Sequence, residues 1–408
     1  MKIESKSPKL RFGFNNQLIV MLLFMLPIIG ESQPILSGPA TTPVFQVDFP
    51  YPTADKPQSK IWYANKQWWA LLPRANGPSL WQRTRDGWKE HMVVNETLRG
   101  EPGRADVWQD GNILTAVGVS INSFAIFRIA LPGKSGVKST AHVLARISAP
   151  SLKDSIETAT IVQDGQKHWW VAADAGNSVY VWHSTDAVKW DQPVRLAEGI
   201  HPDDICNVTA LPNSVMVIWS DQKRDGVFCR EHVNGKGATD WNAKVTIQSG
   251  GLTADDHINT AVTQDGTIWA ATKNSVDSLG KPQLVLRNRQ KNGSWINRPY
   301  FNRQLTAEPS RPVVVVSPDG ALFTGNTIYS KADRFADHIV FGQVEVQGSE
   351  VSRHFTKVIA PDAALKAKVN DITVSKKPFP KGGPWLILAS DKEGRVYEAD
   401  LRKFFGGK

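Results

Sequence analysis

A turn signal followed by a short apolar run recurs seven times along the 408 residues. This repeat constrains the fold more than any other feature of the chain. The signals lie at Asn65-Lys66, Asp110-Gly111, Asp164-Gly165, Asn213-Ser214, Asp265-Gly266, Asp319-Gly320 and Gly382-Gly383. Asn, Asp and Gly tolerate the positive φ that tight hairpins need. The spacing, 45 to 63 residues, suits a unit of four strands. The repeat therefore predicts an all-β fold, a seven-bladed β-propeller.

Tryptophans mark a second position in several of these units. Each of Trp88, Trp190, Trp241 and Trp295 follows a polar turn. We expect them near the starts of the outermost strands, with their rings packed between blades.

The last unit provides only three strand-like segments. The segment 44–49 alternates like a strand and has no other partner. An open ring would expose unpaired strand edges. We therefore expect this N-terminal segment to complete the last blade as a velcro strand.

The N-terminus has the pattern of an export signal. Basic residues precede the apolar run Leu18–Ile29, which is shorter than the roughly 20 residues that span a bilayer. We expect a signal peptide over 1–32, with an uncleaved anchor as the alternative. A Pro-rich lead-in with the closing strand would cover 33–58, and the propeller 59–408. The protein would then be secreted or periplasmic, free of the membrane after signal removal, and a monomer.

The two cysteines, Cys206 and Cys229, do not suit a disulfide. They fall on the first and third strands of one predicted blade, so they would lie roughly 9–10 Å apart. We expect two free, buried thiols and no cysteine-based zinc site.

The chain carries 48 basic and 39 acidic residues, a formal net charge of +9. The basic residues are scattered, which is typical of a solvated surface but also suits an anionic partner such as an acidic polysaccharide. No nucleic-acid-binding motif occurs, so we expect no nucleic-acid partner.

The starts of the first strands should share one face with the ends of the second strands. That face also carries the longer connections, where binding residues usually lie. Its polar residues predict a funnel-shaped site around the central channel. The catalytic candidates are His257, Lys273, Arg311 and Tyr329. The substrate-binding candidates are Arg104, Asp204, Asp256, Asn274 and Asp371.

A structural interpretation competes for several of these residues. An Asp before an inner strand often caps a turn by accepting backbone N–H bonds, and this applies to Asp203, Asp204 and Asp255. His257 could equally be a buried, hydrogen-bonded structural histidine.

Several motifs occur in an order that is similar to a known group of proteins. They include Asp255-Asp256-His257-Ile258-Asn259, Ala270-Ala271-Thr272-Lys273 and Ser310-Arg311-Pro312-Val313-Val314. The chain resembles secreted bacterial BNR/Asp-box-type (sialidase-like) propellers, with distant similarity to propeller-type ulvan lyases. The resemblance implies a carbohydrate-active propeller. Lys273 and Asn274 stand where those lyases carry a second His, and no sialidase arginine triad can be placed.

Two functions follow as hypotheses. The first is an enzyme acting on an acidic polysaccharide. As a lyase it would use Lys273 and Arg311 to neutralise a uronate, with His257 or Tyr329 as the base. As a hydrolase it would use two carboxylates from Asp204, Asp256 and Asp371.

The second hypothesis is a non-catalytic glycan-binding or interaction propeller, with an exposed Trp such as Trp62 as a stacking platform. We expect no cofactor. The alternative is a metal site, with Ca²⁺ as the ion, formed by His201, Asp203, Asp204 and His257.

Overall fold

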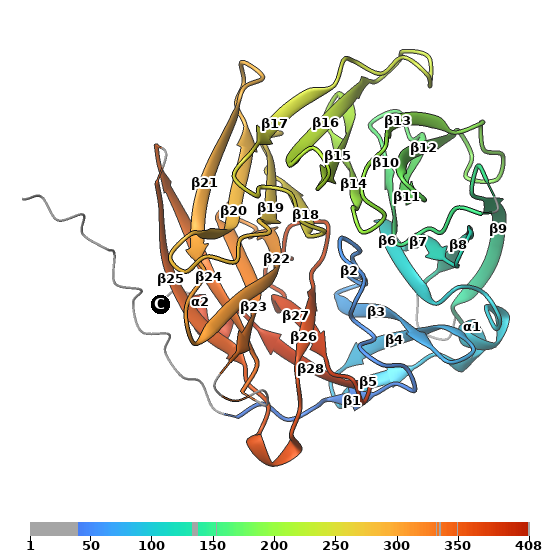
Figure 1. Cartoon of the computed structure of the whole chain (residues 1–408). Coiled ribbons are helices and arrows are strands. Elements are labelled where there is room, and N and C mark those ends of the chain that lie inside the picture. Colours follow the sequence, from blue (N-terminus) through green and yellow to red (C-terminus); the bar gives the residue numbers. More distant parts are fainter. Residues whose placement is uncertain are drawn as a thin grey trace, which may run out of the picture. The chain divides into compact units, whose positions relative to one another are not determined.

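The computed structural model describes residues 40–132, 138–151, 153–331, 333, 336–348 and 350–406. Within these residues, 28 strands form seven antiparallel four-stranded sheets, and Figure 1 shows the sheets following one another around a ring. This confirms the predicted seven-bladed propeller. The segment 1–32, where a signal peptide was predicted, lies outside the described residues.

The first four blades follow the chain in order. Blade 1 contains β2 (Ile61–Ala64), β3 (Gln67–Arg74), β4 (Gly77–Thr84) and β5 (Gly87–Glu90), followed by α1 (Met92–Thr97). Blade 2 contains β6 (Arg104–Asp110), β7 (Ile113–Val119), β8 (Ser123–Ala130) and β9 (Thr140–Ser148). Blade 3 contains β10 (Ala159–Gln163), β11 (Trp169–Ala175), β12 (Ser178–Ser184) and β13 (Val194–Glu198). Blade 4 contains β14 (Cys206–Leu211), β15 (Ser214–Asp221), β16 (Gly226–Val233) and β17 (Val245–Ser249).

The remaining blades complete the ring. Blade 5 contains β18 (Ile258–Val262), β19 (Ile268–Lys273), β20 (Pro282–Arg289) and β21 (Trp295–Asn302). Blade 6 contains β22 (Ala307–Val316), β23 (Leu322–Ser330), β24 (His338–Gln347) and β25 (Glu350–Ile359), followed by η1 (Ala363–Leu365). Blade 7 contains β26 (Asn370–Thr373), β27 (Leu386–Ser390) and β28 (Arg395–Asp400), followed by α2 (Arg402–Phe405).

The fourth strand of blade 7 comes from the other end of the propeller. The strand β1 (Phe45–Gln46) pairs antiparallel with β28, with Phe45 opposite Val396, which confirms the predicted closing strand. Gly394 makes room for it. At this residue φ is +77°, and a Cβ would collide with the carbonyl oxygen of Val47. The N-terminal and C-terminal strands thus share one sheet, shown in blue and red in Figure 1.

Apolar inner and middle strands fill the spaces between blades. The middle strands β11 and β15 are buried along their whole length, because both of their faces pack against neighbouring blades. Trp88 and Trp295 lie in outermost strands as predicted. Trp190 and Trp241 lie in the connections just before β13 and β17.

Both cysteines are free and buried, on β14 and β16, as predicted. No helix among the described residues is long and apolar enough to cross a membrane.

Candidate functional site

The site lies where the first strands of the blades begin, and an extra segment of chain enters it. Residues 50–60 leave the closing strand and run into the mouth of the ring before β2 starts. Thr53 Oγ1 donates to the Asp371 carbonyl at 2.6 Å, and Gln58 Nε2 donates to the Ala159 carbonyl at 3.0 Å. These contacts tie the segment to blades 7 and 3.

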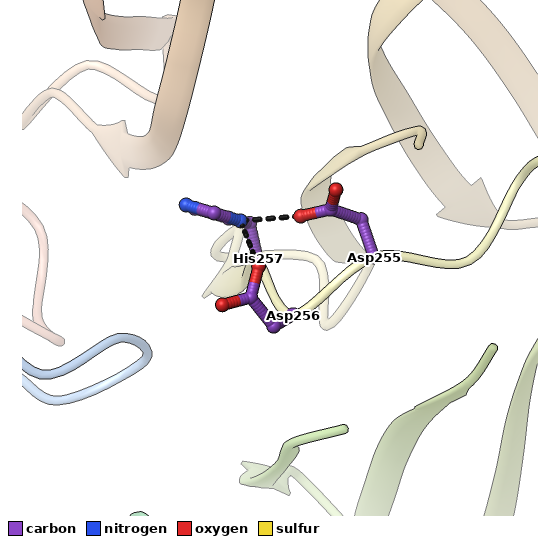
Figure 2. Close-up of side chains that lie close together, drawn as sticks. All are labelled: Asp255, Asp256 and His257. Atoms are coloured by element: carbon purple, nitrogen blue, oxygen red, sulfur yellow. Dashed lines mark hydrogen bonds and ion pairs between the residues drawn. The ribbon is translucent and has the colours of Figure 1, made fainter. Parts of the chain in front are cut away.

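His257 lies between two carboxylates at the start of β18. Its Nδ1 is 2.5 Å from Asp255 Oδ1 and 2.6 Å from Asp256 Oδ1. Figure 2 shows both contacts on the same ring nitrogen, with the other nitrogen pointing away from both acids. That nitrogen, Nε2, lies 3.5 Å from Ser310 Oγ. The ring is buried, so its orientation is held by these partners.

Asp256 has polar partners on two sides. Besides His257, Lys56 from the entering segment forms an ion pair with Asp256 Oδ2. Burial acts to raise the pKa of Asp256, but the hydrogen bond from His257 and the charge of Lys56 hold it well below its usual range. Asp256 is therefore an ionised carboxylate.

The candidate cation Lys273 has an internal partner. Its Nζ lies 3.2 Å from Asp255 Oδ2, which also accepts from Ser275 Oγ at 3.0 Å. Asp255 thus bridges Lys273 and His257, two of the four predicted catalytic residues.

Arg311 and Tyr329, the other two, meet in blade 6. Arg311 forms an ion pair with Asp371 and donates from Nε to Tyr329 Oη at 2.7 Å. Tyr329 in turn donates to Asn370 Oδ1 at 2.7 Å. Burial raises the pKa of Tyr329 to about 12, although the charge of Arg311 opposes this. Tyr329 is thus a protonated donor near neutral pH.

The Arg311–Asp371 pair sits on unusual backbone. Both residues lie at β-bulges and have positive φ, +55° for Arg311 and +49° for Asp371. Such conformations cost roughly 1–3 kcal/mol each and concentrate at functional sites. Here they turn both side chains toward each other at the mouth.

Arg104 is also ion-paired. Its guanidinium lies 2.6 Å from Asp55 Oδ1, and Lys60 Nζ lies 3.4 Å from the other carboxylate oxygen of Asp55. Lys60 is fully buried. Burial acts to raise the pKa of Asp55, but Lys60 and Arg104 lower it overall.

Two of the predicted substrate-binding residues point into the protein. Asp204 is fully buried and accepts from the backbone N–H of His201 at 2.7 Å and of Gln222 at 3.0 Å, which is a turn-capping arrangement. Asn274 is buried and bonds to Pro282 and Arg287. Trp62 is only 2% exposed, so the expectation of an exposed Trp62 was wrong: its ring packs between blades 1 and 2.

Three carboxylates from three blades converge beside this network. Single oxygens of Glu157, Asp203 and Asp256 lie within 4.8 Å of one another. They precede β10, β14 and β18, so three neighbouring strand starts bring them together. Burial and the charge of Asp174 raise the pKa of Glu157 to about 7. Burial raises the pKa of Asp174 itself to about 6.

The donor atoms of this acidic group suit a hard cation. Oxygen-only ligands are what Ca²⁺ or Mg²⁺ prefers. Asp203 and Asp256 belong to the group, whereas Asp204 is occupied by backbone donors. His257 belongs to a separate group with Asp255 and Asp256. The predicted set of His201, Asp203, Asp204 and His257 is therefore not assembled as one metal site.

The role of residues 50–60 at the mouth was not predicted from the sequence. The signal was available, because Thr53, Asp55, Lys56, Gln58 and Lys60 form a polar stretch between two strands. It was assigned to a lead-in. The proximity of Glu157 to Asp256 was also missed, although each residue comes just before the first strand of a blade.

Comparisons with known proteins describe the fold alone. No protein-family model matches the sequence, and no curated protein matches it. Among solved structures, a Trypanosoma rangeli sialidase aligns over 76% of this chain and 58% of its own, with 13% identity and a TM-score of 0.46. The chain thus spans less than two thirds of that sialidase.

Two further structures show a similar level of likeness. A Penicillium chrysogenum α-L-arabinanase aligns over 72% of this chain and 94% of its own, with 12% identity and a TM-score of 0.42. A luciferin-regenerating enzyme aligns over 80% and 100%, with 9% identity and a TM-score of 0.43. Likeness at this level transfers no activity to the chain.

Proposed function

We propose that this protein is a carbohydrate-active propeller that hydrolyses a glycosidic bond at the Glu157–Asp256 carboxylate pair. The observation that carries the proposal is the geometry of the pair. Two carboxylates from different blades place oxygens within 4.8 Å of each other, and their surroundings push their pKa values in opposite directions. Such a split assigns one group as acid and the other as base or nucleophile.

The roles follow from the protonation states. Glu157, with a pKa of about 7, would protonate the leaving oxygen as the glycosidic bond breaks. Asp256, held ionised by His257, would attack the anomeric carbon and form a glycosyl ester. Water would then cleave the ester, with Glu157 taking its proton. The 4.8 Å limit on the distance between single oxygens of the two residues suits the short carboxyl separation of retaining enzymes, about 5–5.5 Å, better than the roughly 6.5–9.5 Å of inverting enzymes.

The lyase version is less well supported. It requires Lys273 and Arg311 to meet a uronate, but Asp255 and Asp371 already neutralise them. The hydrolase version keeps Asp256 from the predicted set and replaces Asp204 and Asp371 with Glu157.

The second candidate is a non-catalytic glycan-binding protein, and the Lys56–Asp256 ion pair favours it. A lysine on the nucleophile must withdraw before Asp256 can attack. If Lys56 never withdraws, the site can bind a glycan but cannot cleave it.

The test is to incubate the purified protein with neutral and acidic polysaccharides and to measure reducing ends. Absorbance near 235 nm would reveal a lyase. We expect new reducing ends with retained configuration by NMR, and a loss on the order of a thousandfold in kcat for Glu157→Gln. Glu198→Gln, in the same blade but exposed, is the matched control.

Two results decide between the candidates. Binding of a glycan, seen as a higher melting temperature, without any bond cleavage would favour the binding protein. Hydrolysis unchanged in both Glu157→Gln and Asp256→Asn would refute the assigned pair.

Secretion of the protein remains part of the proposal, and detection of the chain outside the cytoplasm tests it.

A further inference from the structure

A cavity of about 410 Å³ lies between blades 4 and 5, and neither Glu157 nor Asp256 lines it. Its walls come from β17, from the connection 250–257, from the β19–β20 connection and from β20 and β21. One part of the wall is apolar, formed by Leu252, Val276, Pro282, Val285 and Pro299. A concave site with an apolar wall and a few polar groups is typical of small-ligand pockets.

A fully buried guanidinium lies behind the polar part of the wall. Arg287 is 0% exposed, and among the described residues no carboxylate pairs with it. Burial lowers its pKa to about 9. A buried charge without a counter-charge is costly, so buried charges in proteins are usually paired.

Neutral oxygens satisfy Arg287 instead. Its N–H groups donate to Asn297 Oδ1 at 2.6 Å, to Asn274 Oδ1 at 3.3 Å and to Gln248 Oε1. Its other bonds, both 2.9 Å long, go to hydroxyl groups of Thr272 and Thr253. All three amide residues line the cavity.

This arrangement determines what the cavity offers. Arginine has no acceptor, so each amide must turn its oxygen to Arg287 and its NH₂ group away. Asn297 donates one N–H to the Ile247 carbonyl, and Asn274 donates one N–H to the Pro282 carbonyl. Each NH₂ carries two hydrogens, so donors remain. The lining residues include Lys281 and no acidic residue.

We propose that this cavity binds a ligand that carries a carboxylate. The carboxylate would accept from the amide N–H groups and provide the missing counter-charge for Arg287, while the apolar wall covers the rest of the ligand. A sugar acid is the class that suits a carbohydrate-active protein, and only that part rests on the proposed function. The Coulomb attraction reaches Arg287 through one layer of amides in a poorly solvated wall.

The experiment measures binding by calorimetry with three probes: glucuronate, its neutral counterpart glucose, and hexanoate as an acid that is not a sugar. The decisive variant is Asn297→Asp, which places a negative charge against Arg287 and in the cavity wall. The guanidinium gains a counter-ion, but the N–H that Asn297 donates to the Ile247 carbonyl is lost, so we expect a melting temperature close to that of the wild type, which checks that the variant is folded. We also expect it to weaken binding of the acidic probes by at least about tenfold through like-charge repulsion.

Asn292→Asp is the matched control. It makes the same change on the same blade, in the exposed β20–β21 turn, and should leave binding unchanged. Binding of either acid that Asn297→Asp alone abolishes supports the proposal, and the acid that binds more tightly identifies the ligand class. Equal binding of glucose and glucuronate, acid binding unaffected by Asn297→Asp, or no binding of either acid would overturn it. The assay involves no turnover, so its failure would leave the proposed hydrolysis intact.

Discussion

Each cation predicted to meet a ligand has an acidic partner within the protein. Arg104 pairs with Asp55, Lys273 with Asp255 and Arg311 with Asp371. These internal ion pairs therefore largely cancel the attraction that the three cations would exert on an anion at the mouth. What the mouth offers instead is carboxylate chemistry, which is why the proposed reaction rests on Glu157.

The Arg311–Asp371 pair predicts a measurable stability effect. Asp371→Asn keeps the side-chain shape and the tolerance of positive φ, so it removes mainly the charge. Breaking a buried pair costs about 3–5 kcal/mol, but the Arg311 side chain is 24% exposed, so water recovers part of it. We expect a loss of about 2 kcal/mol in the free energy of unfolding by urea titration. Arg311→Gln should cost less in the Asp371→Asn background than alone, and strict additivity would contradict the pairing.

Glu157 predicts a pH dependence of stability. Its folded pKa of about 7 lies above the ordinary 4.5, so the folded protein holds this proton more tightly than the unfolded chain does. The stabilisation is complete below the unfolded pKa and disappears as pH rises through about 7.

Glu157→Gln should therefore flatten the fall in melting temperature between about pH 4.5 and 7. The slope should not vanish, because the pKa of Asp174 is also raised, to about 6. Glu198→Gln serves again as the control. Identical pH profiles for wild type and Glu157→Gln would show that Glu157 titrates normally.

Among the elements, the short strand β1 has a large effect on how the ring closes. This two-residue strand completes blade 7, and its Phe45 ring reaches blade 1, with centroids 4.4 Å from Trp81 and 5.4 Å from Trp88. The closing strand is thus held by ring packing as well as by its pairing with β28.

Phe45→Ala tests that packing. Removing a large aromatic ring from a core costs about 3–5 kcal/mol. Phe45 is only partly buried, so we expect about 2 kcal/mol in the free energy of unfolding. Val44→Ala, at the neighbouring 41% exposed residue, should cost much less. An equal loss in both variants would mean that the ring contacts contribute little.

The elements also show how far the sequence could predict the structure. The seven hairpins and the closing strand were predictable, because turn chemistry and alternation are local. The entry of residues 50–60 into the mouth was not, because it depends on distant partners: Lys56 meets Asp256, 200 residues away, and Thr53 meets Ser390, 337 residues away. The carboxylate pair could not be predicted for the same reason, since Glu157 and Asp256 belong to different blades.

At the scale of the whole molecule, the reactivity of the two thiols shows whether the ring opens. Cys206 and Cys229 are buried in blade 4, and burial raises the pKa of both, that of Cys229 to about 12. Only the thiolate reacts. We expect neither thiol to react with a disulfide reagent in the native protein and both to react in denaturant. Rapid labelling of one native thiol would show that blade 4 opens locally.

The segment 53–60 has a consequence for how the molecule comes apart. It bonds to Asp106 in blade 2, Ala159 in blade 3, Asp256 before blade 5 and Asp371 in blade 7. In repeat proteins each unit contacts only its neighbours, and units can unfold one after another. Because the segment 53–60 bonds to residues of four blades, it couples blades that do not contact one another. We therefore expect a single cooperative transition, with slowly exchanging amides in all seven blades protected by the same free energy.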